Sequence, residues 1–486
     1  MNIKPINYYI NPADRNFGRA EYSLGVLFEG IGLPSVSVND ISEAEIIYST
    51  ECPNTTGTKV LWIKCCQNND WNTTAPPVFW ENGIPWLGQK NVQGEICGDI
   101  LYSTYGLLTG VFETEESKDQ WGVPIARGGL YESLGLLHYP WVAKYCEILY
   151  SSICASFQVE LQRVPLWPDN KRYAIVMSHD VDAPFSFIDT DFRKKWLSKL
   201  ILEKRYNEFS RGVLGYAGTI TKKIAGIYPK SNCDPNFCFE SWVEFQRTLK
   251  SKSAFYVATV TSADQYGDSS DVNYIHSRQD IVQVLQCLMG QGWEIGLHGS
   301  INAWRAEERL YSEKVALQKV LGEQSLIGIR HHYWALDDKV PERTLAMHAR
   351  VGFKYDSSLG LNDAPGYRRG IAWPFNPYDK SSERMLPIIE IPPTIMDGGI
   401  FYRDVTPSQG KKEILDHIKR TFESGGAVVM NWHLEQLNPS RLRRAGPTLV
   451  DALLELVNDS EIYWASPKEL SQWWSARREK LKAFSQ

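Results

Sequence analysis

Two aspartates follow an apolar and β-branched run near the middle of the chain. The run begins at Tyr173, passes through His179 to Asp180 and Asp182, and is closed by Pro184. This pattern predicts a buried strand with two carboxylates at its C-terminal end. Because side chains alternate along a strand, Asp180 and Asp182 share one face and His179 lies on the other. Two neighbouring carboxylates repel each other unless a cation or a shared proton lies between them.

Polar side chains also end several later strands. His298, Arg330, His332 and His433 come at or just after the end of an apolar run, and Asp356 ends another. The C-terminal ends of the strands form the active-site mouth of a β/α barrel, so we expect these residues near the two aspartates. The simpler alternative is that each residue only makes a turn, an ion pair or a helix cap. Several strands that present Asp, His and Arg at the same end favour a functional cluster.

The residue types in this cluster indicate metal chemistry. Aspartate and histidine suit a divalent metal ion, with zinc the preferred candidate, and a catalytic site keeps one position open for water. Such a metal lowers the pKa of its water to about 7 and polarises a carbonyl group. A neighbouring carboxylate as base, an arginine that fixes it and a histidine as acid would complete a metal-assisted amide or ester hydrolase.

The elements that position these residues alternate between strands and helices from residue 253 onward. Together with the strand that begins at Tyr173, this alternation predicts a parallel sheet or a closed barrel. The expected strands are 254–260, 293–298, 326–330, 353–356, 388–391, 427–433 and 462–465. The expected helices are 278–289, 306–320, 342–351, 411–423, 448–457 and 467–482.

The length of 486 residues exceeds a usual single core, so we expect two or three domains, of which the sequence pattern indicates two. Residues 1–164 are predicted to form a smaller α/β domain of unknown role, and residues 165–486 to form the barrel. The segment 165–171 contains two prolines and is the expected linker. In the first domain we expect strands at 44–49 and 59–64, and helices near 21–28, 100–108 and 139–149.

The composition is that of a globular enzyme, with 43% hydrophobic residues, 22% charged residues and a net charge of -5. The first residues lack the apolar region of a signal peptide, and no apolar run is long enough to span a membrane. The nine cysteines are irregularly spaced, which favours free thiols in the cytoplasm over a disulfide framework or a cysteine zinc site. The expected location is therefore cytoplasmic.

A basic insertion is expected at about residues 185–239. Between residues 193 and 230 it holds ten Lys and Arg against two acidic residues. A solvated helix on the barrel is the favoured interpretation, and the alternative is a lid that attracts an anionic substrate or makes peripheral contact with a membrane. Nucleic acid is not an expected partner, because no binding motif accompanies the basic residues.

Residues 173–482 resemble the NodB-type polysaccharide deacetylases, motif by motif and in chain order. The matching stretches are Ser178-His-Asp-Val-Asp182, His298-Gly-Ser-Ile-Asn302, Gly328-Ile-Arg-His-His-Tyr333, Tyr355-Asp-Ser-Ser358 and Val429-Met-Asn-Trp-His433. The resemblance implies a distorted β/α barrel that removes acetyl groups from N-acetylated sugars with a bound metal. More weakly, residues 106–149 resemble an uncharacterised domain that precedes such barrels in bacterial proteins.

The resemblance also implies a role for each matching residue. Asp180 would be the base, Arg330 would orient it, and His433 would protonate the leaving amine. The implied metal ligands are Asp182, His298 and Asn302. The substrate would be an N-acetylated sugar or polysaccharide intermediate, for example in cell-envelope or exopolysaccharide synthesis.

Two departures from the family pattern leave alternatives open. Val181 separates the two aspartates, which are adjacent in the family, so base and ligand could be exchanged between them. Asn302 replaces a histidine, and asparagine is the weaker zinc ligand, so His332 or His179 could take its place. His331, His332 and Trp334 are the expected substrate contacts. The rival functions are a carbohydrate-binding protein without activity and a metal hydrolase of another carbon-nitrogen or ester bond.

Overall fold

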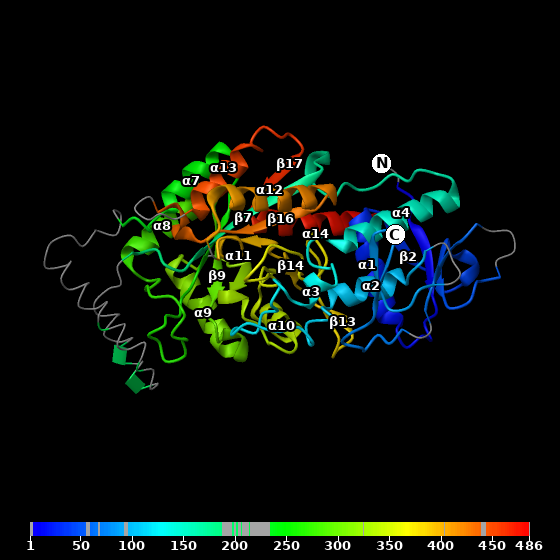
Figure 1. Ribbon diagram of the computed structural model, residues 1–486, viewed down its shortest axis with the longest axis horizontal. Helices are drawn as coiled ribbons and strands as arrows, with labels where there is room; N and C mark the ends of the chain where they lie inside the picture. Colours follow the sequence, from blue (N-terminus) through cyan, green and yellow to red (C-terminus); the bar gives the residue numbers. More distant parts are fainter. Residues whose placement is uncertain are drawn as a thin grey trace.

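The computed structural model describes most of the chain (Figure 1). The described residues are 3–54, 59–66, 69–91, 96–186, 197–198, 201–202, 206, 213, 234–323, 325–402, 404–438 and 444–485. Most of the basic insertion expected at residues 185–239 lies outside the described residues. The predicted lid or membrane contact of this insertion therefore also concerns residues outside them.

A nine-stranded sheet of parallel strands organises the second part of the chain. Its hydrogen-bonded order is β14-β11-β10-β9-β8-β7-β16-β15, with β17 also paired to β7. The strands are β7 (Tyr173–Val181), β8 (Ala254–Val257), β9 (Glu294–Gly299), β10 (Gly328–His331), β11 (Tyr355–Asp356), β14 (Ile389–Glu390), β15 (Ile395–Met396), β16 (Ala427–Asn431) and β17 (Ile462–Ala465).

The central strand β7 is almost entirely buried, as expected for an apolar run in a parallel sheet covered on both faces. Its first half pairs with β17 and its second half with β8 along one edge, while β16 follows the other edge. The terminal strands β14 and β15 are not paired with each other in the described part of the chain. The sheet is therefore open between β14 and β15 in this part of the chain. Its parallel strands and curled shape agree with a barrel-like fold, but within the described residues the sheet does not close into a barrel.

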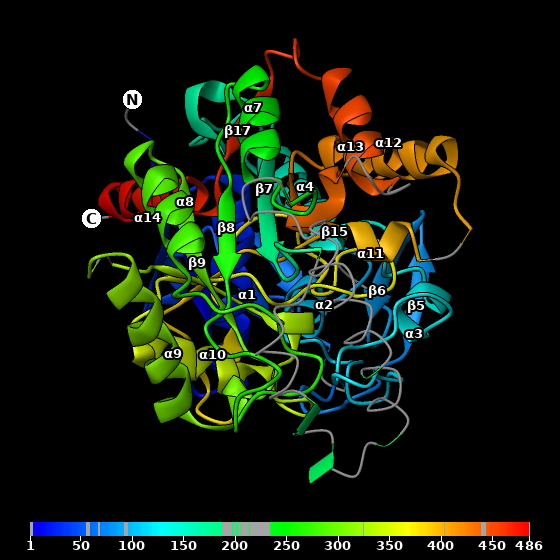
Figure 2. The same cartoon turned by 90° about the vertical axis from the view of Figure 1, so that its left-hand side faces the viewer.

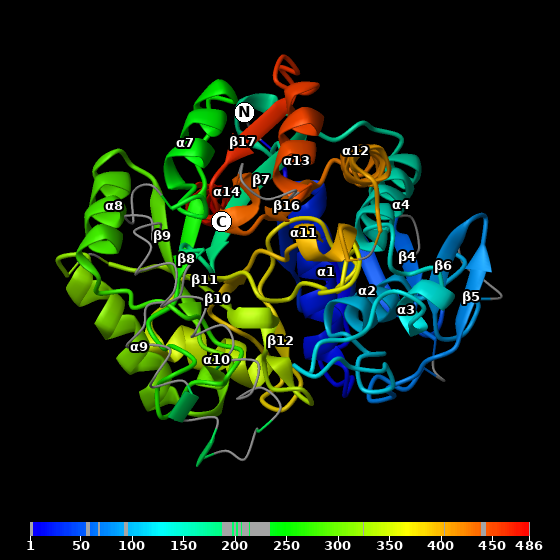
Figure 3. The same ribbon diagram turned by 60° about the vertical axis from the view of Figure 1, so that its left-hand side comes forward.

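Helices surround the curled sheet in two views of the molecule (Figures 2 and 3). Each helix packs an apolar face on the strands. Helices α12 and α14 each begin with a capping box and a proline in the first turn, which fix their first residues. The helices are α7 (Phe239–Thr248), α8 (Gln279–Gly290), α9 (Glu307–Val320), α10 (Pro341–Val351), α12 (Pro407–Glu423), α13 (Ala445–Leu454) and α14 (Pro467–Phe484). These bounds agree with the predicted helices to within a few residues, and α7 was not predicted.

The first part of the chain contains a smaller parallel sheet in the order β2-β1-β3-β4. A separate hairpin joins β5 and β6 through Asn82-Gly83, both with positive φ, which is the turn that the twist of a hairpin favours. The strands are β1 (Ile6–Ile10), β2 (Ser35–Ser37), β3 (Ile46–Ser49), β4 (Leu61–Lys64), β5 (Val78–Glu81) and β6 (Ile84–Leu87). The helices are α1 (Phe17–Ile31), α2 (Ile100–Leu108), α3 (Leu130–Ser133) and α4 (Trp141–Phe157).

The two parts of the chain are in extensive contact. A single hydrophobic cluster contains residues from both parts. The last helix, α14, lies against α1, where Arg478 makes an ion pair of 2.9 Å with Glu29 (Figure 1). Glu113 is buried between Arg368 and Arg369. A division at residue 164 stays a prediction, and no described helix has the length and apolar character that crossing a membrane requires.

Candidate metal centre

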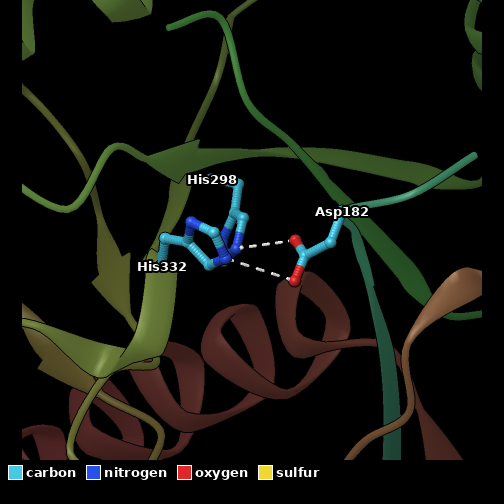
Figure 4. Close-up of side chains that lie close together, drawn as sticks. All are labelled: Asp182, His298 and His332. Atoms are coloured by element: carbon cyan, nitrogen blue, oxygen red, sulfur yellow. Dashed lines mark ion pairs between the residues drawn. The ribbon is translucent and has the colours of Figure 1, made fainter. Parts of the chain in front are cut away.

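The carboxylate of Asp182 lies just beyond the end of β7 and faces three imidazole rings. Nε2 of His298 lies 3.2 Å from its Oδ1, and Nε2 of His332 lies 3.3 Å from its Oδ2 (Figure 4). Nε2 of His433 lies 3.2 Å from the same Oδ2. These four residues, which we call the Asp182 cluster, come from the ends of β7, β9, β10 and β16, because parallel strands end at one edge of the sheet.

The contacts of Nδ1 in His298 and His332 determine which nitrogen of each ring could bind a metal beside Asp182. Nδ1 of His298 lies 3.1 Å from the carbonyl oxygen of Arg330. Nδ1 of His332 lies 3.3 Å from Oδ1 of Asp271. Nδ1 is therefore the donor in each of these contacts, so in the neutral form of each ring the bare nitrogen is Nε2, which faces Asp182 and is the atom that could bind a metal.

The spacing of the inner atoms also fits a metal ion. The ligand atoms of Asp182, His298 and His332 all lie within 4.8 Å of one another. Ligand atoms around a tetrahedral metal with bonds of about 2.1 Å lie about 3.4 Å apart, close to the two observed separations. Oδ1 of Asp182 and Nε2 of His298 are shielded from solvent, and apart from their contact with each other neither has a hydrogen-bond partner among the described residues. The three side chains could hold a divalent metal.

The charges in the cluster are strongly coupled. Burial by itself would raise the pKa of Asp182, but the charge of His332 and the contacts with the rings of His298, His332 and His433 together outweigh it and hold that pKa well below the ordinary value. Burial opposes protonation of His332, yet Asp182 and Asp271 raise its pKa to about 10. A bound cation would replace that proton as the positive charge between the carboxylates, since metal ligands bind in their deprotonated form.

Asp180 is the second carboxylate of the strand tip, and its two oxygens are both held. Nη1 of Arg330 donates to Oδ1 at 3.0 Å, and Nδ2 of Asn431 donates to Oδ2 at 2.6 Å. Nε and Nη2 of Arg330 donate to the carbonyl and hydroxyl oxygens of Ser357, and its guanidinium lies over the ring of Tyr256. Burial favours the neutral acid, but the charge of Arg330, together with His298 and His433, outweighs it and keeps the pKa of Asp180 below its usual value. Asp180 is therefore a fixed, ionised carboxylate.

His433 lies on the other side of Asp182 and has its own carboxylate. Its Nδ1 lies 2.8 Å from Oδ1 of Asp397, whose Oδ2 accepts a hydrogen bond from the backbone N–H of His433. Burial opposes protonation of this ring, but the charge of Asp397 and the contact with Asp182 outweigh it, so the pKa of His433 lies well above the ordinary value. The ring is held as a protonated acid with Nε2 directed at Asp182.

A cavity of about 590 Å³ opens onto these groups. It is lined by residues of both parts of the chain, which are Asp119, Gln120, Trp121, Asp180, Asp182, His332, Tyr333, Trp334, Asn362, Met396, Gly398, Asn431 and His433. The volume is in the range of small-molecule binding sites.

The structure does not bring every predicted site residue to this cavity. Asn302 precedes the short helix Ala303–Arg305, and its carbonyl oxygen accepts from Arg309. His331 is fully buried, and its Nε2 lies 2.9 Å from Nε2 of His348. His179 points to the other face of β7, where Nδ1 contacts the carbonyl of Trp432. Trp334 lines the cavity together with His332, and its contact with a substrate stays a prediction.

Several functional candidates were missed in the sequence. Asp397 directly follows the two-residue strand β15, so its position at a strand end could have been noticed had so short a strand been recognisable. Asp271 lies in a long loop with no periodic pattern, and only the fold brings it to His332. Asn431 shares a strand face with His433 but carries no charge, which left its contact with Asp180 unpredicted.

Comparisons with known proteins give similarities of fold only. No protein-family model matches the chain, and no curated protein matches it. A solved structure described as a polysaccharide deacetylase from Mycobacterium smegmatis is 18% identical with a TM-score of 0.40, covering 64% of this chain and 93% of that one. The Puue allantoinase is 13% identical with a TM-score of 0.39, covering 65% and 94%. A protein of Pseudomonas aeruginosa PAO1 described as a polysaccharide deacetylase is 13% identical with a TM-score of 0.38, covering 65% and 95%.

Proposed function

We propose that the protein is a metal-dependent hydrolase that removes the acetyl group from an N-acetylated sugar or polysaccharide intermediate. One observation carries the proposal. The carboxylate of Asp182 and the Nε2 atoms of His298 and His332 converge beside a fixed carboxylate, Asp180, with the protonated ring of His433 across the same cavity.

The metal site would consist of Asp182, His298 and His332, with zinc as the preferred ion for this set of ligands. When bound, the ion supplies Lewis acidity toward the acetyl carbonyl and the attacking water. Asp271 and the carbonyl of Arg330 hold the two rings in the tautomer that binding needs.

Asp180 would act as the general base that takes a proton from the attacking water. Its ionised state supports this role, because a carboxylate must be deprotonated before it can accept. Arg330 and Asn431 fix both oxygens, so the lone pair that accepts the proton has a defined direction.

His433 would act as the general acid that protonates the departing amine. Asp397 holds its Nδ1 and stabilises the imidazolium, and Nε2 faces the cavity. The surroundings lower the pKa of the proposed base Asp180 and raise the pKa of the proposed acid His433. Amide hydrolysis needs such a pair of an ionised base and a protonated acid.

The test measures bound metal in the purified protein and acetate release from N-acetylglucosamine oligomers, with and without a chelator. We expect one metal per chain, activity that the chelator removes, and a loss of kcat of about a hundredfold or more in Asp180→Asn. Asp416→Asn, which changes a surface carboxylate paired with Lys412, is the matched control and should retain activity. A protein that binds no metal at micromolar zinc would overturn the proposal.

The same assay separates the rival functions. Oligomers that bind without releasing acetate would indicate a carbohydrate-binding protein. Hydrolysis confined to small cyclic amides or esters in a parallel panel would indicate a metal hydrolase of another bond. The cytoplasmic location remains a prediction, which fractionation of the source cells would test.

A further inference from the structure

A short segment of the first part of the chain forms one wall of the cavity over the Asp182 cluster. Asp119, Gln120 and Trp121 line it together with residues that follow β10 and β15. The first part of the chain also approaches α11 (Asp397–Ile400), where Nη2 of Arg127 donates to the carbonyl of Gly399 (Figures 2 and 3). We call residues 119–121 the wall segment.

Trp121 belongs to a stack of three rings that leads to the metal centre. The ring of Tyr333 lies 4.3 Å from that of His332 with an angle of 18° between the planes. The indole of Trp121 lies 4.4 Å from the Tyr333 ring with an angle of 15°. Two rings cannot occupy the same face of one phenol, so Tyr333 lies between the other two. The indole is thus the outermost ring of a stack that begins at a metal-ligand candidate.

The wall segment is held firmly in this position. Oδ1 of Asp119 accepts hydrogen bonds from the backbone N–H groups of Trp121 and Val123, at 2.8 and 3.0 Å. Its Oδ2 accepts from Nδ2 of Asn362 at 2.8 Å, and that amide also donates to the carbonyl of Tyr333. Through Asn362, the carboxylate of Asp119 therefore ties the wall segment to the backbone of Tyr333.

Three further hydrogen bonds anchor the chain around the wall segment to loops of the second part of the chain. The ammonium of Lys118 donates to the carbonyl of Asp338. The backbone N–H groups of Ala126 and Arg127 donate to the two oxygens of Asp363, at 3.0 and 2.9 Å. A wall anchored on both sides is pre-organised, so a ligand does not have to order it on binding.

The chemistry of this wall fits a sugar ring. A flat indole offers an apolar face to the C–H groups of a pyranose, and the neighbouring side chains of Gln120, Asn362 and Asp119 offer donors and acceptors to its hydroxyls. We propose that the wall segment is a specificity subsite in which Trp121 binds the sugar ring next to the one that carries the acetamido group. This inference rests on the proposed function and extends it, because it assigns a role in substrate recognition to the first part of the chain.

The experiment compares Trp121→Ala, Trp121→Phe and the control Trp80→Ala. Trp80 also belongs to the first part of the chain and contacts another aromatic ring, Trp141, but it does not line the cavity. Acetate release is measured with N-acetylglucosamine and with its oligomers of two to four units. Binding of the tetramer to metal-free protein is measured by calorimetry, and metal content and Tm are recorded for each variant.

We expect Trp121→Ala to raise KM for the oligomers by about tenfold, because tryptophan side chains often contribute a large share of the binding free energy of a ligand. The value of kcat should stay within about twofold of that of the unmodified protein. The single sugar should be affected much less, because it does not reach the subsite. Trp121→Phe should recover most of the affinity, and Trp80→Ala should leave KM unchanged. Tetramer binding to the metal-free protein should weaken in parallel.

Failure of this inference and failure of the proposed function give different results. Acetate release with the same oligomer KM in Trp121→Ala would overturn the subsite and leave the function intact. Tetramer binding that depends on Trp121 without acetate release would support the subsite and reject the activity. Loss of bound metal in Trp121→Ala would overturn the subsite, since Trp121 would then act by positioning His332 through the ring stack. Absence of both tetramer binding and acetate release would overturn both.

Discussion

A partly exposed group and a fully buried group of histidine and aspartate lie side by side in this protein and differ in what they can do. In the Asp182 cluster, Nε2 atoms converge on a carboxylate beside a cavity. In the second group, the His331 cluster, Nε2 of His331 faces Nε2 of His348 at 2.9 Å, and Nδ1 of His348 lies 2.9 Å from Asp356. Consecutive residues, His331 and His332, belong to different clusters.

The difference shows that lone-pair direction and access, and not residue type, distinguish a metal centre from a structural network. In the His331 cluster each ring uses its nitrogens on a neighbour, and Asp356 accepts from the backbone N–H and the hydroxyl of Ser358. Burial lowers the pKa of His331 to about 3, so this ring is neutral. No nitrogen of His331 is left for a cation, whereas His298 and His332 each keep one for Asp182.

The strongest test of the comparison removes the carboxylate of each cluster. Asp182→Ala should lower zinc affinity by about a thousandfold or more, because it removes the central ligand and leaves two neutral rings. Asp356→Asn should keep the metal and lower the free energy of unfolding by about 3 kcal/mol, because it removes a buried carboxylate that contacts His348 and Ser358. Metal analysis and urea unfolding of both variants measure the two effects. Equal metal loss in both would contradict the distinction.

The adjacent histidines provide a finer test. His332→Gln should reduce zinc affinity by about a hundredfold, since one of three protein ligands is lost. His331→Gln should leave zinc affinity within about twofold and cost about 1–3 kcal/mol of stability, because it leaves the buried nitrogen of His348 without its partner. Competition with a chromogenic chelator measures the affinities, and thermal unfolding measures the stability. A stable His331→Gln protein that binds no metal would show that the two clusters act as one.

A buried carboxyl without a histidine partner gives a prediction for pH. Glu294 begins β9, the strand that ends at His298, and accepts hydrogen bonds from Tyr355 and the backbone of Lys468. Burial raises its pKa to about 7, so the folded state binds a proton that the unfolded state releases near pH 4.5. The contribution of Glu294 to stability is therefore complete below pH 4.5 and is lost as the pH rises to 7, by on the order of 3 kcal/mol.

The variant Glu294→Gln isolates that contribution, because other buried acids such as Glu313 titrate in the same direction. The difference in unfolding free energy between the variant and the unmodified protein should move in favour of the variant between pH 5 and pH 8. Urea unfolding at several pH values measures it. A difference that does not change with pH would show that Glu294 is ionised in the folded protein.

The smallest expected effects are at Asp271 and Asn302. Asp271 contacts the expected ligand His332, and Asn302 is the residue that the family resemblance implied as a ligand. Asp271→Asn should reduce zinc affinity by about tenfold, because Asp271 holds the tautomer of His332 without touching the ion. Asn302→Ala should change it by less than about twofold if His332 is the third ligand. A larger loss in Asn302→Ala than in His332→Gln would restore Asn302 to the metal site.

The regular part of the fold could be predicted because its signals are local. The apolar run from Tyr173 and the alternation of strands and helices gave the parallel sheet, and most helix bounds agree within a few residues. The terminal strands β14 and β15, and β11 next to β14, have two residues each, so hydrophobic periodicity cannot detect their pairing. That is why the sequence did not distinguish a closed barrel from the open, curled sheet.

The sequence by itself determined which chemical groups reach the C-terminal edge of the sheet, because strand ends and side-chain alternation are properties of the local chain. Asp180, Asp182, His298, Arg330 and His433 were all identified in this way. Only the tertiary structure decided that His332 turns toward Asp182 while His331 turns toward His348, because the chain leaves the strand there and Tyr333 adopts a positive φ. It alone also decided that Asp271, Asp397 and Trp121 join the site, since their contacts span long stretches of sequence that carry no common pattern.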